Sequence, residues 1–167
     1  RSGQVDVAFT SATFANQQPK GYDLLNCASV DSRGISLPTI APGATTKQTG
    51  DEYPAGNAVT QDLALRRAIN YGVKRQTLID NVLNGYGQIA YSVGDNMPWS
   101  SEAMKCEEDL ARAKALLDEA GWVAGADGGR AKDGVTAAFD LYYSSSDSVR
   151  QAIAMEFANQ MNELGIK

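Results

Sequence analysis

TQDLALRRAINYGVKRQTLIDNVLNG, residues 60–85, has the clearest helical periodicity in the chain. Its first half places four apolar side chains on one helical face: Leu65, Ala68, Ile69 and Val73. After a polar junction, its second half has another apolar stripe: Leu78, Ile79, Val82 and Leu83. We therefore predict two consecutive helices that turn back on each other and bury these faces.

The ends of this helical pair also have sequence signals. Thr60 is of a type that caps helix N-termini, and Asp62 would lie in the first turn, where a negative charge is favourable. Asn84 and Gly85 are the two residue types that most readily adopt the left-handed conformation ending a helix. We predict that the pair begins at Thr60 and ends at Asn84-Gly85.

Two more amphipathic helices follow. One spans residues 110–120 and is stopped by Gly121, so that Trp122 folds back onto it. Its apolar positions are Leu110, Ala113, Leu116, Leu117 and Ala120. The last helix begins near residues 146–148, where Ser148 and Gln151 have capping-box spacing. It is predicted to bury Val149, Ile153, Phe157, Met161 and Leu164.

Strands are predicted between the helices from alternating apolar and polar residues. The four candidates are residues 5–9, 34–40, 88–93 and 137–143. Residues 41–58 have no periodicity and are predicted to form a long surface loop, and 127–129 and 133–134 are predicted turns. Strands interleaved with helices indicate an α/β fold in a single domain, residues 1–167.

Composition limits the classes of function. With 167 residues, of which 43% are hydrophobic, the chain can bury a core, and its apolar runs are too short to cross a bilayer. A formal net charge of −5 argues against binding to nucleic acid or to an anionic membrane surface. Cys27 and Cys106 are far apart, and they are read either as two isolated buried thiols or as one disulfide.

The sequence predicts neither an enzyme nor a metal or cofactor site. The chain has no histidine, so the commonest general base and the commonest metal ligand are both missing. Residues 85–90 fit the loose dinucleotide pattern G-x-G-x-x-A, but they follow a helix instead of a strand. The acidic run 107–109 is read as the favourable charge at the start of the next helix.

One polar loop is a candidate ligand site. Tyr142, Tyr143, Ser144, Ser145 and Ser146 run from a predicted strand into a helix that carries Arg150 one turn later. Such a junction offers free backbone N–H groups, hydroxyls and aromatic faces to a solute. The alternative is that the serines cap the helix and the tyrosines pack.

Three stretches, in order, carry a family resemblance. LRRAINYGVKRQTLIDNVLNGYG, DLARAKALLDEAGW and FDLYYSSSDSVRQAIAMEFANQMNELGIK resemble signatures of the extracytoplasmic solute-binding proteins of family 5. The opening GQVDVAF resembles a strand of the same family more loosely. This family comprises the receptors of ABC importers for peptides, nickel complexes and related solutes.

The resemblance implies a fold and a function. It implies that residues 1–167 are a partial second lobe of a two-lobed, periplasmic-binding-protein-like (class II) receptor, with a mixed sheet flanked by helices. The receptor would bind a peptide or a nickel complex between its lobes and deliver it to a membrane permease. Its expected location is extracytoplasmic, in the periplasm or as a cell-surface lipoprotein.

The resemblance also adds residues to the predicted site. In the family the opening strand passes between the lobes, which implies that Phe9, Thr10 and Ser11 lie beside the polar loop near the hinge. Two other classes of function stay open. The chain is either part of a hydrolase or transferase whose catalytic residues lie outside it, or a structural or adhesive module, which would need a large exposed apolar patch.

Overall fold

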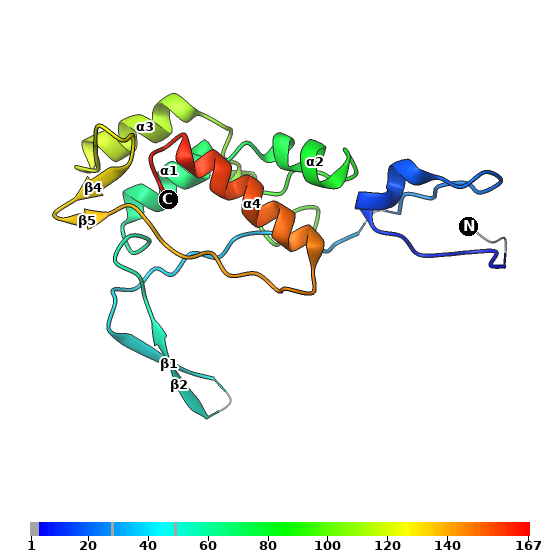
Figure 1. The fold of residues 1–167 in the computed structure, drawn as a ribbon, viewed down its shortest axis with the longest axis horizontal. Coiled ribbons are helices and arrows are strands. Elements are labelled where there is room, and N and C mark those ends of the chain that lie inside the picture. The colour runs from blue at the N-terminus through cyan, green and yellow to red at the C-terminus, as the bar shows by residue number, and fades with distance from the viewer. Residues whose placement is uncertain (1–3, 28, 49) are drawn as a thin grey trace.

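The computed structural model describes residues 4–27, 29–48 and 50–167, and within these residues four α-helices supply most of the regular structure. They are α1 (Leu63–Gly72), α2 (Arg75–Leu83), α3 (Leu110–Glu119) and α4 (Ser148–Asn162). Figure 1 shows them grouped together, with the C-terminus among them and the N-terminal segment drawn out to one side. Two short 3-10 turns, η1 (Ala12–Gln17) and η2 (Glu102–Met104), lie in the connecting chain.

α1 and α2 are the two predicted consecutive helices, but the prediction that they turn back on each other was wrong, because each packs mainly on another helix and not on its neighbour in the sequence. The predicted apolar face of α1 is confirmed, because Leu65, Ala68 and Ile69 are buried. α1 packs on α3 and α2 packs on α4, so the pair is covered by the other two helices and not by a sheet. α2 ends as predicted at Asn84, whose φ of 52° lies in the left-handed region.

The N-cap of α1 is Asp62, and the prediction of Thr60 was wrong. The Asp62 carboxylate accepts hydrogen bonds from the N–H groups of Ala64 (2.8 Å) and Leu65 (3.3 Å). A carboxylate satisfies two orphan donors and also places negative charge at the positive end of the helix. Thr60 is instead fully buried two residues before the cap.

The Asp62 carboxylate has two further partners. It accepts hydrogen bonds from the indole Nε1 of Trp122 (3.1 Å) and from Nζ of Lys132 (2.8 Å). Burial alone would raise the pKa of this carboxyl, but the hydrogen bonds from Lys132, the Leu65 N–H and Trp122 outweigh it and lower the pKa below its ordinary value. Asp62 therefore joins the start of α1 to two segments that lie 60 and 70 residues further along the chain.

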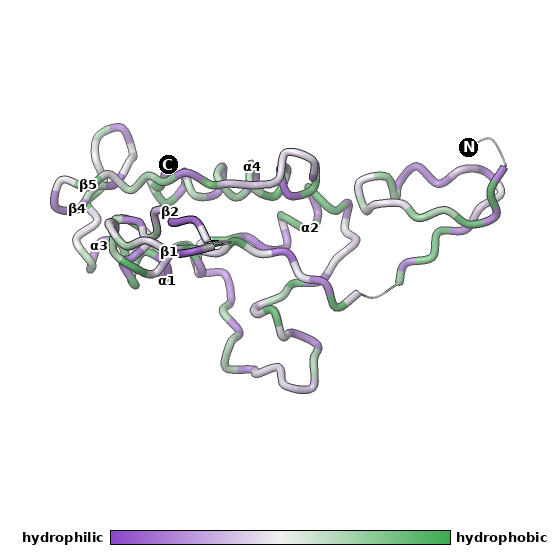
Figure 2. Tube along the Cα trace, turned by 90° about the horizontal axis from the view of Figure 1, so that it is seen from below, coloured by the Kyte–Doolittle hydropathy of each residue, from purple (hydrophilic) through white to green (hydrophobic). Residues whose placement is uncertain are grey.

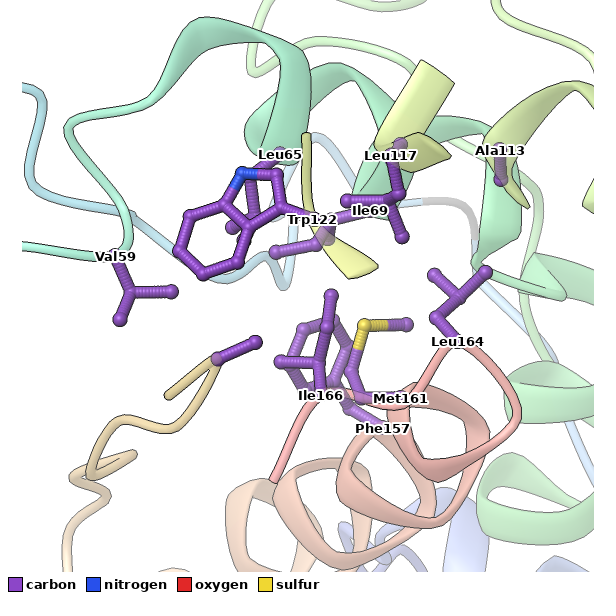
Figure 3. Packing of buried hydrophobic residues seen from close by; sticks show 12 residues of the cluster. Val59, Leu65, Ile69, Ala113, Leu117, Trp122, Phe157, Met161, Leu164 and Ile166 are labelled. Atoms are coloured by element: carbon purple, nitrogen blue, oxygen red, sulfur yellow. The ribbon is translucent and has the colours of Figure 1, made fainter. Parts of the chain in front are cut away.

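α3 ends as predicted. Gly121 has a φ of 84°, and the N–H of Trp122 donates to the carbonyl of Leu117 at 2.9 Å, which turns the indole back onto the helix. Trp122 is 2% exposed. In Figure 3 its ring lies between residues of α1 and α3 on one side and residues of α4 and the C-terminal turn on the other. The indole is therefore central to the core.

α4 supplies the other half of the core, with Phe157 and Met161 buried as predicted and Leu164 and Ile166 buried just beyond it. The predicted start near residues 146–148 is confirmed, but the cap is Asp147, and the Ser148 capping box was wrong. Asp147 Oδ1 accepts from the N–H groups of Val149 (3.1 Å) and Arg150 (3.0 Å). As at α1, the helix is capped by an ionised carboxylate and not by the predicted hydroxyl.

A small antiparallel sheet covers the end of the helical group. β3 (Val123–Ala124), β4 (Arg130–Lys132) and β5 (Val135–Thr136) are neighbours in that order. The two predicted turns are confirmed, because Gly128 and Asp133 have φ values of 79° and 50°. The polar stretch between these turns is β4 itself.

Arg130 of β4 is a buried cation with three carbonyl or carboxylate partners. Its Nε donates to the carbonyl of Leu164 at 3.0 Å, and its Nη1 donates to the carbonyl of Trp122 and to Asp118 Oδ1, both at 2.5 Å. The side chain is 7% exposed. Arg130 therefore ties β4 to the end of α3 and to the turn after α4.

The predicted long loop at residues 41–58 was wrong, because most of it forms a β-hairpin. β1 (Ala44–Gln48) and β2 (Asp51–Ala55) are antiparallel, with Thr46 opposite Tyr53, and Gly50 at the turn has a φ of 94°. The described side chains of both strands are exposed except that of Ala55, so no alternating apolar pattern marks them. The hairpin projects away from the helices in Figure 1.

Three predicted strands are not formed within the described residues. Residues 5–9 have no strand partner, with Val7 88% and Phe9 98% exposed, and Figures 1 and 2 both show this segment apart from the helices. Residues 34–40 are extended, and their alternation survives only as half-buried Ile35 and Leu37 against the core. Residues 88–93 form no regular structure and pass into bends and a turn at residues 91–93. A strand needs a neighbouring chain for its backbone groups, and within the described residues none of these three segments is part of a strand ladder, although the N–H of Asn57 donates to the carbonyl of Ile40 at 3.1 Å.

The fourth predicted strand, residues 137–143, is extended, and only its first residues are paired. The N–H of Lys167 donates to the carbonyl of Ala137 (2.8 Å), and the N–H of Phe139 donates to the carbonyl of Lys167 (3.0 Å). Phe139 and Leu141 face the core, as their alternation predicts. The segments before and after α4 are therefore hydrogen-bonded to each other.

Both cysteines are free thiols, so the disulfide alternative does not apply to this structure. The prediction of two buried thiols is wrong for Cys27, which is exposed, while Cys106 is half-buried. Burial raises the pKa of the Cys106 thiol despite the nearby charges of Arg75 and Arg112.

Candidate functional site

A hollow of about 750 Å³ lies where the chain enters α4. One wall is residues 32–38, another is residues 139–144, and the first turns of α4 contribute Arg150, Ile153 and Ala154. Gly56, Asn57 and Thr60 complete it. This volume lies in the range typical of small-solute pockets.

Asp147 fixes the α4 end of the hollow. Its carboxylate caps the helix and also pairs with Arg150 Nε at 3.1 Å, so the guanidinium is held one turn into α4. The hydrogen bond from the Arg150 N–H and the charge of its guanidinium hold the pKa of Asp147 below its usual range. Arg150 keeps other N–H groups that have no partner among the described residues.

The predicted polar loop contributes only in part. Tyr142, Tyr143, Ser144 and Arg150 line the hollow, whereas Ser145 and Ser146 do not. The Oγ atoms of Ser144 and Ser146 are hydrogen-bonded to each other at 3.0 Å. Tyr142 is 88% exposed, so its ring is available to a partner instead of being packed in the core.

The second predicted group is not brought to the hollow. Phe9, Thr10 and Ser11 are not among the residues that line it. Ser11 lies next to η1, where its Oγ is hydrogen-bonded to Thr13 Oγ1 at 2.6 Å. Their role at a hinge stays a prediction about the intact protein.

Several lining residues were not predicted from the sequence. Asn57 has a recognisable signal, because its Oδ1 accepts from the N–H groups of Val59 (2.8 Å) and Thr60 (3.0 Å), a turn typical of asparagine before a helix. Arg33 and Asp140 carry no such signal and reach the hollow only through the tertiary fold.

Thr60 is the least expected member of the lining. The hydroxyl of this fully buried residue has no hydrogen-bond partner among the described residues. A buried hydroxyl without a partner is costly, so the Thr60 hydroxyl is a candidate hydrogen-bonding group of the hollow.

The chemistry of the lining suits a binding site. It combines two guanidinium groups (Arg33 and Arg150), one carboxylate (Asp140), hydroxyls, aromatic rings and apolar side chains. No group of three or more His, Cys, Asp or Glu side chains in the described part of the chain is placed to hold a metal ion. Among the same residues, no helix combines the length and apolar character that crossing a membrane requires.

Comparison with known families decides the affiliation. The model of "Bacterial extracellular solute-binding proteins, family 5 Middle" matches residues 1–167, the entire chain. The chain belongs to this family. The resemblance carried by the three sequence stretches is therefore confirmed.

Relatives of this family 5 chain include Protein XP55 of Streptomyces lividans, 38% identical over 174 residues that cover 100% of the chain and 28% of the relative. The nickel-binding periplasmic protein of Escherichia coli strain K12 is 35% identical over 112 residues, covering 65% of the chain and 21% of the relative. The family 5 chain thus spans between about a fifth and just over a quarter of the length of these relatives.

A solved structure of the family supports the fold class. The oligopeptide-binding protein AppA from Bacillus subtilis, in complex with a nonapeptide, matches with a TM-score of 0.60 and 31% identity over 66% of this chain and 23% of that one. The predicted α/β fold of a periplasmic-binding-protein-like lobe is confirmed at this level. Within the described residues, the sheets are two small antiparallel ones, and the segments on either side of α4 are joined only through Lys167.

Proposed function

We propose that the protein is the substrate-binding component of an ABC importer and that residues 1–167 are part of its second lobe. It binds peptides or nickel complexes between two lobes and delivers them to a membrane permease, without catalysis. The observation that carries this proposal is the family match along the whole chain, together with relatives named for nickel and oligopeptide binding.

The proposed location is extracytoplasmic, in the periplasm or at the cell surface as a lipoprotein. The family is named as extracellular and the E. coli relative as periplasmic, which supports this location. An acidic surface of net charge −5 is compatible with capture of solutes away from nucleic acid.

We assign the solute-contacting loop to Tyr142, Tyr143 and residues 144–146, with Arg150 behind them. An exposed aromatic ring covers apolar solute groups, and the guanidinium with the backbone N–H groups at the start of α4 receives a carboxylate. Solutes in open α/β folds bind beyond the carboxyl ends of strands, which is where residues 137–143 run into this loop. Phe9, Thr10 and Ser11 are proposed to approach it at the hinge of the intact receptor.

The test is solute binding by the full-length protein, measured by calorimetry with a nonapeptide and with a nickel–histidine complex as probes. We expect one probe to bind with a dissociation constant near or below micromolar, roughly −8 kcal/mol. The isolated 167-residue chain should bind the same probe far more weakly, since it offers only one side of the cleft. If the full-length protein binds neither probe at millimolar concentration, the proposed function is wrong.

A further inference from the structure

The turn after α2 places the single Asn-Gly dipeptide of the chain, Asn84-Gly85, on the surface. Asn84 has a φ of 52° and a ψ of 33°, and both residues are exposed. Such a dipeptide is chemically reactive, because glycine has no side chain to hinder attack of its backbone nitrogen on the preceding side-chain amide. The surroundings of the dipeptide therefore decide how fast this reaction runs in the protein.

Asn84 already has one of the two backbone angles of the reactive conformation. Ring closure between the Gly85 nitrogen and Asn84 Cγ requires the nitrogen to eclipse Cβ, which happens at a ψ of roughly −120°. A φ of roughly +60° with this ψ is the first central position of a type II′ turn. Asn84 has the required positive φ, so a rotation about ψ is the backbone change that separates it from ring closure.

Two hydrogen bonds oppose that rotation. The N–H of Gly85 donates to the carbonyl of Ile79 at 3.1 Å and so keeps the attacking nitrogen in the cap of α2. The side-chain Nδ2 of Asn84 donates to the carbonyl of Ala12 at 3.0 Å and so holds the side-chain amide. The reaction therefore requires a local opening of this turn.

The second of these bonds also links α2 to the N-terminal part of the chain. Ala12 is the first residue of η1, which contacts α2, and Ala15 within η1 is 7% exposed. The bond joins two residues that lie 72 positions apart in the sequence. A chemical change of the Asn84 amide therefore acts directly on the attachment of η1.

We propose that Asn84 is a site of spontaneous deamidation, which opening of the α2 cap permits and which weakens the attachment of η1. The Gly85 nitrogen gives its proton to a base and attacks Cγ, the Cγ–Nδ2 bond breaks, and Nδ2 leaves as ammonia. Water then opens the succinimide ring. Opening at Cγ gives aspartate, and opening at the backbone carbonyl gives isoaspartate, in which the main chain runs through Cβ and Cγ.

Both products change the contact with η1. The amide donor becomes a carboxylate, which cannot donate and which repels the partial negative charge of the Ala12 carbonyl. The new charge also lies at the C-terminus of α2, where the helix dipole disfavours it. Isoaspartate in addition inserts a methylene group into the main chain at the left-handed cap. The modified protein therefore holds η1 less firmly on α2.

Peptide mapping by mass spectrometry tests the site, in full-length protein kept in a mildly alkaline buffer. Asn96 is the matched internal control, because it is exposed and has a φ of 63° but precedes Met97 instead of a glycine. We expect conversion at Asn84 to be at least about tenfold faster than at Asn96, with isoaspartate among the products. Equal rates at the two positions, or aspartate as the sole product, overturn the proposal.

A synthetic peptide with the sequence of residues 80–89 tests the control by the cap. In this peptide the partners of both hydrogen bonds, Ile79 and Ala12, are missing. We expect its asparagine to convert at least about tenfold faster than Asn84 in the folded protein under the same conditions. Equal rates in the peptide and the folded protein overturn the proposed control by the cap.

Hydrogen exchange tests the effect on η1, through the amide of Phe14, which donates to the carbonyl of Ser11 at 3.0 Å. In full-length Asn84→Asp, we expect this amide to exchange about fivefold faster than in wild type. Asn84→Gly, which removes the donor without adding charge, should show a smaller increase. Asn96→Asp is the control for added charge, and the amide of Ala113 in α3 is the reference for global stability. Unchanged exchange of Phe14 in Asn84→Asp, or an equal acceleration of Ala113, overturns the proposal.

Discussion

Gln160 of α4 binds the backbone of Lys74 at both ends of its side-chain amide. The N–H of Lys74 donates to Gln160 Oε1 at 2.9 Å, and Gln160 Nε2 donates to the carbonyl of Lys74 at 3.4 Å. The Gln160 side chain is buried, and Lys74 is the junction between α1 and α2. A side chain of α4 therefore holds the junction between α1 and α2.

Replacing this amide tests how much the junction depends on it. Gln160→Leu leaves the Lys74 N–H without a partner, and we expect a loss of about 1–3 kcal/mol in the free energy of unfolding. Asn159→Leu, at the exposed neighbouring position, is the matched control and should change stability by less than about 0.5 kcal/mol. Denaturant titration measures both, and equal losses would contradict the assigned role.

Gly72 makes room for Leu164. A Cβ at Gly72 would lie 2.6 Å from Leu164 Cδ1, and Leu164 is 1% exposed, so it has little space to move. Gly72→Ala should therefore destabilise the protein by about 1–3 kcal/mol, despite a gain of roughly 1 kcal/mol in helix propensity. Combined with Leu164→Ala, it should cost less than the sum of the single changes. Strict additivity in thermal or denaturant unfolding would show that the two side chains do not meet.

Asp62 gives the fold a defined sensitivity to acid. Its pKa is lowered in the folded state, so its contribution is present above the unfolded pKa, roughly 4, and is lost as the pH falls through the folded pKa. Asp62→Asn should thus be most destabilising near pH 7, and the difference from wild type should shrink below about pH 4. Lys132→Met should remove part of the same pH dependence. A difference that stays constant from pH 7 to pH 3 would refute this.

Burial separates two apolar positions of the helical pair. Ile69 is 4% exposed, so Ile69→Ala should cost about 2–5 kcal/mol. Leu83 near the end of α2 is only half-buried, and Leu83→Ala should cost distinctly less. Denaturant titration of the two variants checks the order, and the reverse order would show that the buried face of the pair is misassigned.

The polar loop can be tested without confounding affinity with stability. Because Asp147 caps α4, replacing Ser144, Ser145 and Ser146 with alanine should leave the melting temperature of the full-length protein nearly unchanged while weakening solute binding by about tenfold. Asp147→Ala is the contrasting variant and should cost about 1 kcal/mol of stability. Unchanged solute affinity in the triple variant would exclude the loop from the site.

The helices could be predicted because each buries one face. Apolar residues therefore recur in the sequence with the helical period of about 3.6 residues. Leu65, Ile69 and Phe157 all lie where the pattern predicts. The hairpin β1–β2 could not be predicted, because its described side chains are polar or exposed on both faces. Apolar and polar residues do alternate in residues 5–9. Such alternation predicts that a strand would have one apolar and one polar face, but it does not predict whether a neighbouring strand is present.

Only those residues of the candidate site that are close together in the sequence could be predicted. Tyr142, Tyr143, Ser144 and Arg150 lie within nine residues of one another, and the junction of extended chain and helix marks them. Arg33 and Asn57 reach the same hollow from the opposite wall, which depends on contacts far apart in the sequence. The two helix caps show a similar limit, since the choice of Asp62 over Thr60 involves Trp122 and Lys132, sixty or more residues away.

The contacts of Arg130 affect which parts of the protein can unfold locally. One guanidinium holds the carbonyls of Trp122 and Leu164 and the carboxylate of Asp118, and without the guanidinium the two buried carbonyls would lose their donor. The end of α3, the small sheet and the turn after α4 therefore cannot fray separately. They behave as one cooperative unit, whereas the β1–β2 hairpin, whose described side chains are exposed except that of Ala55, is expected to open independently of them.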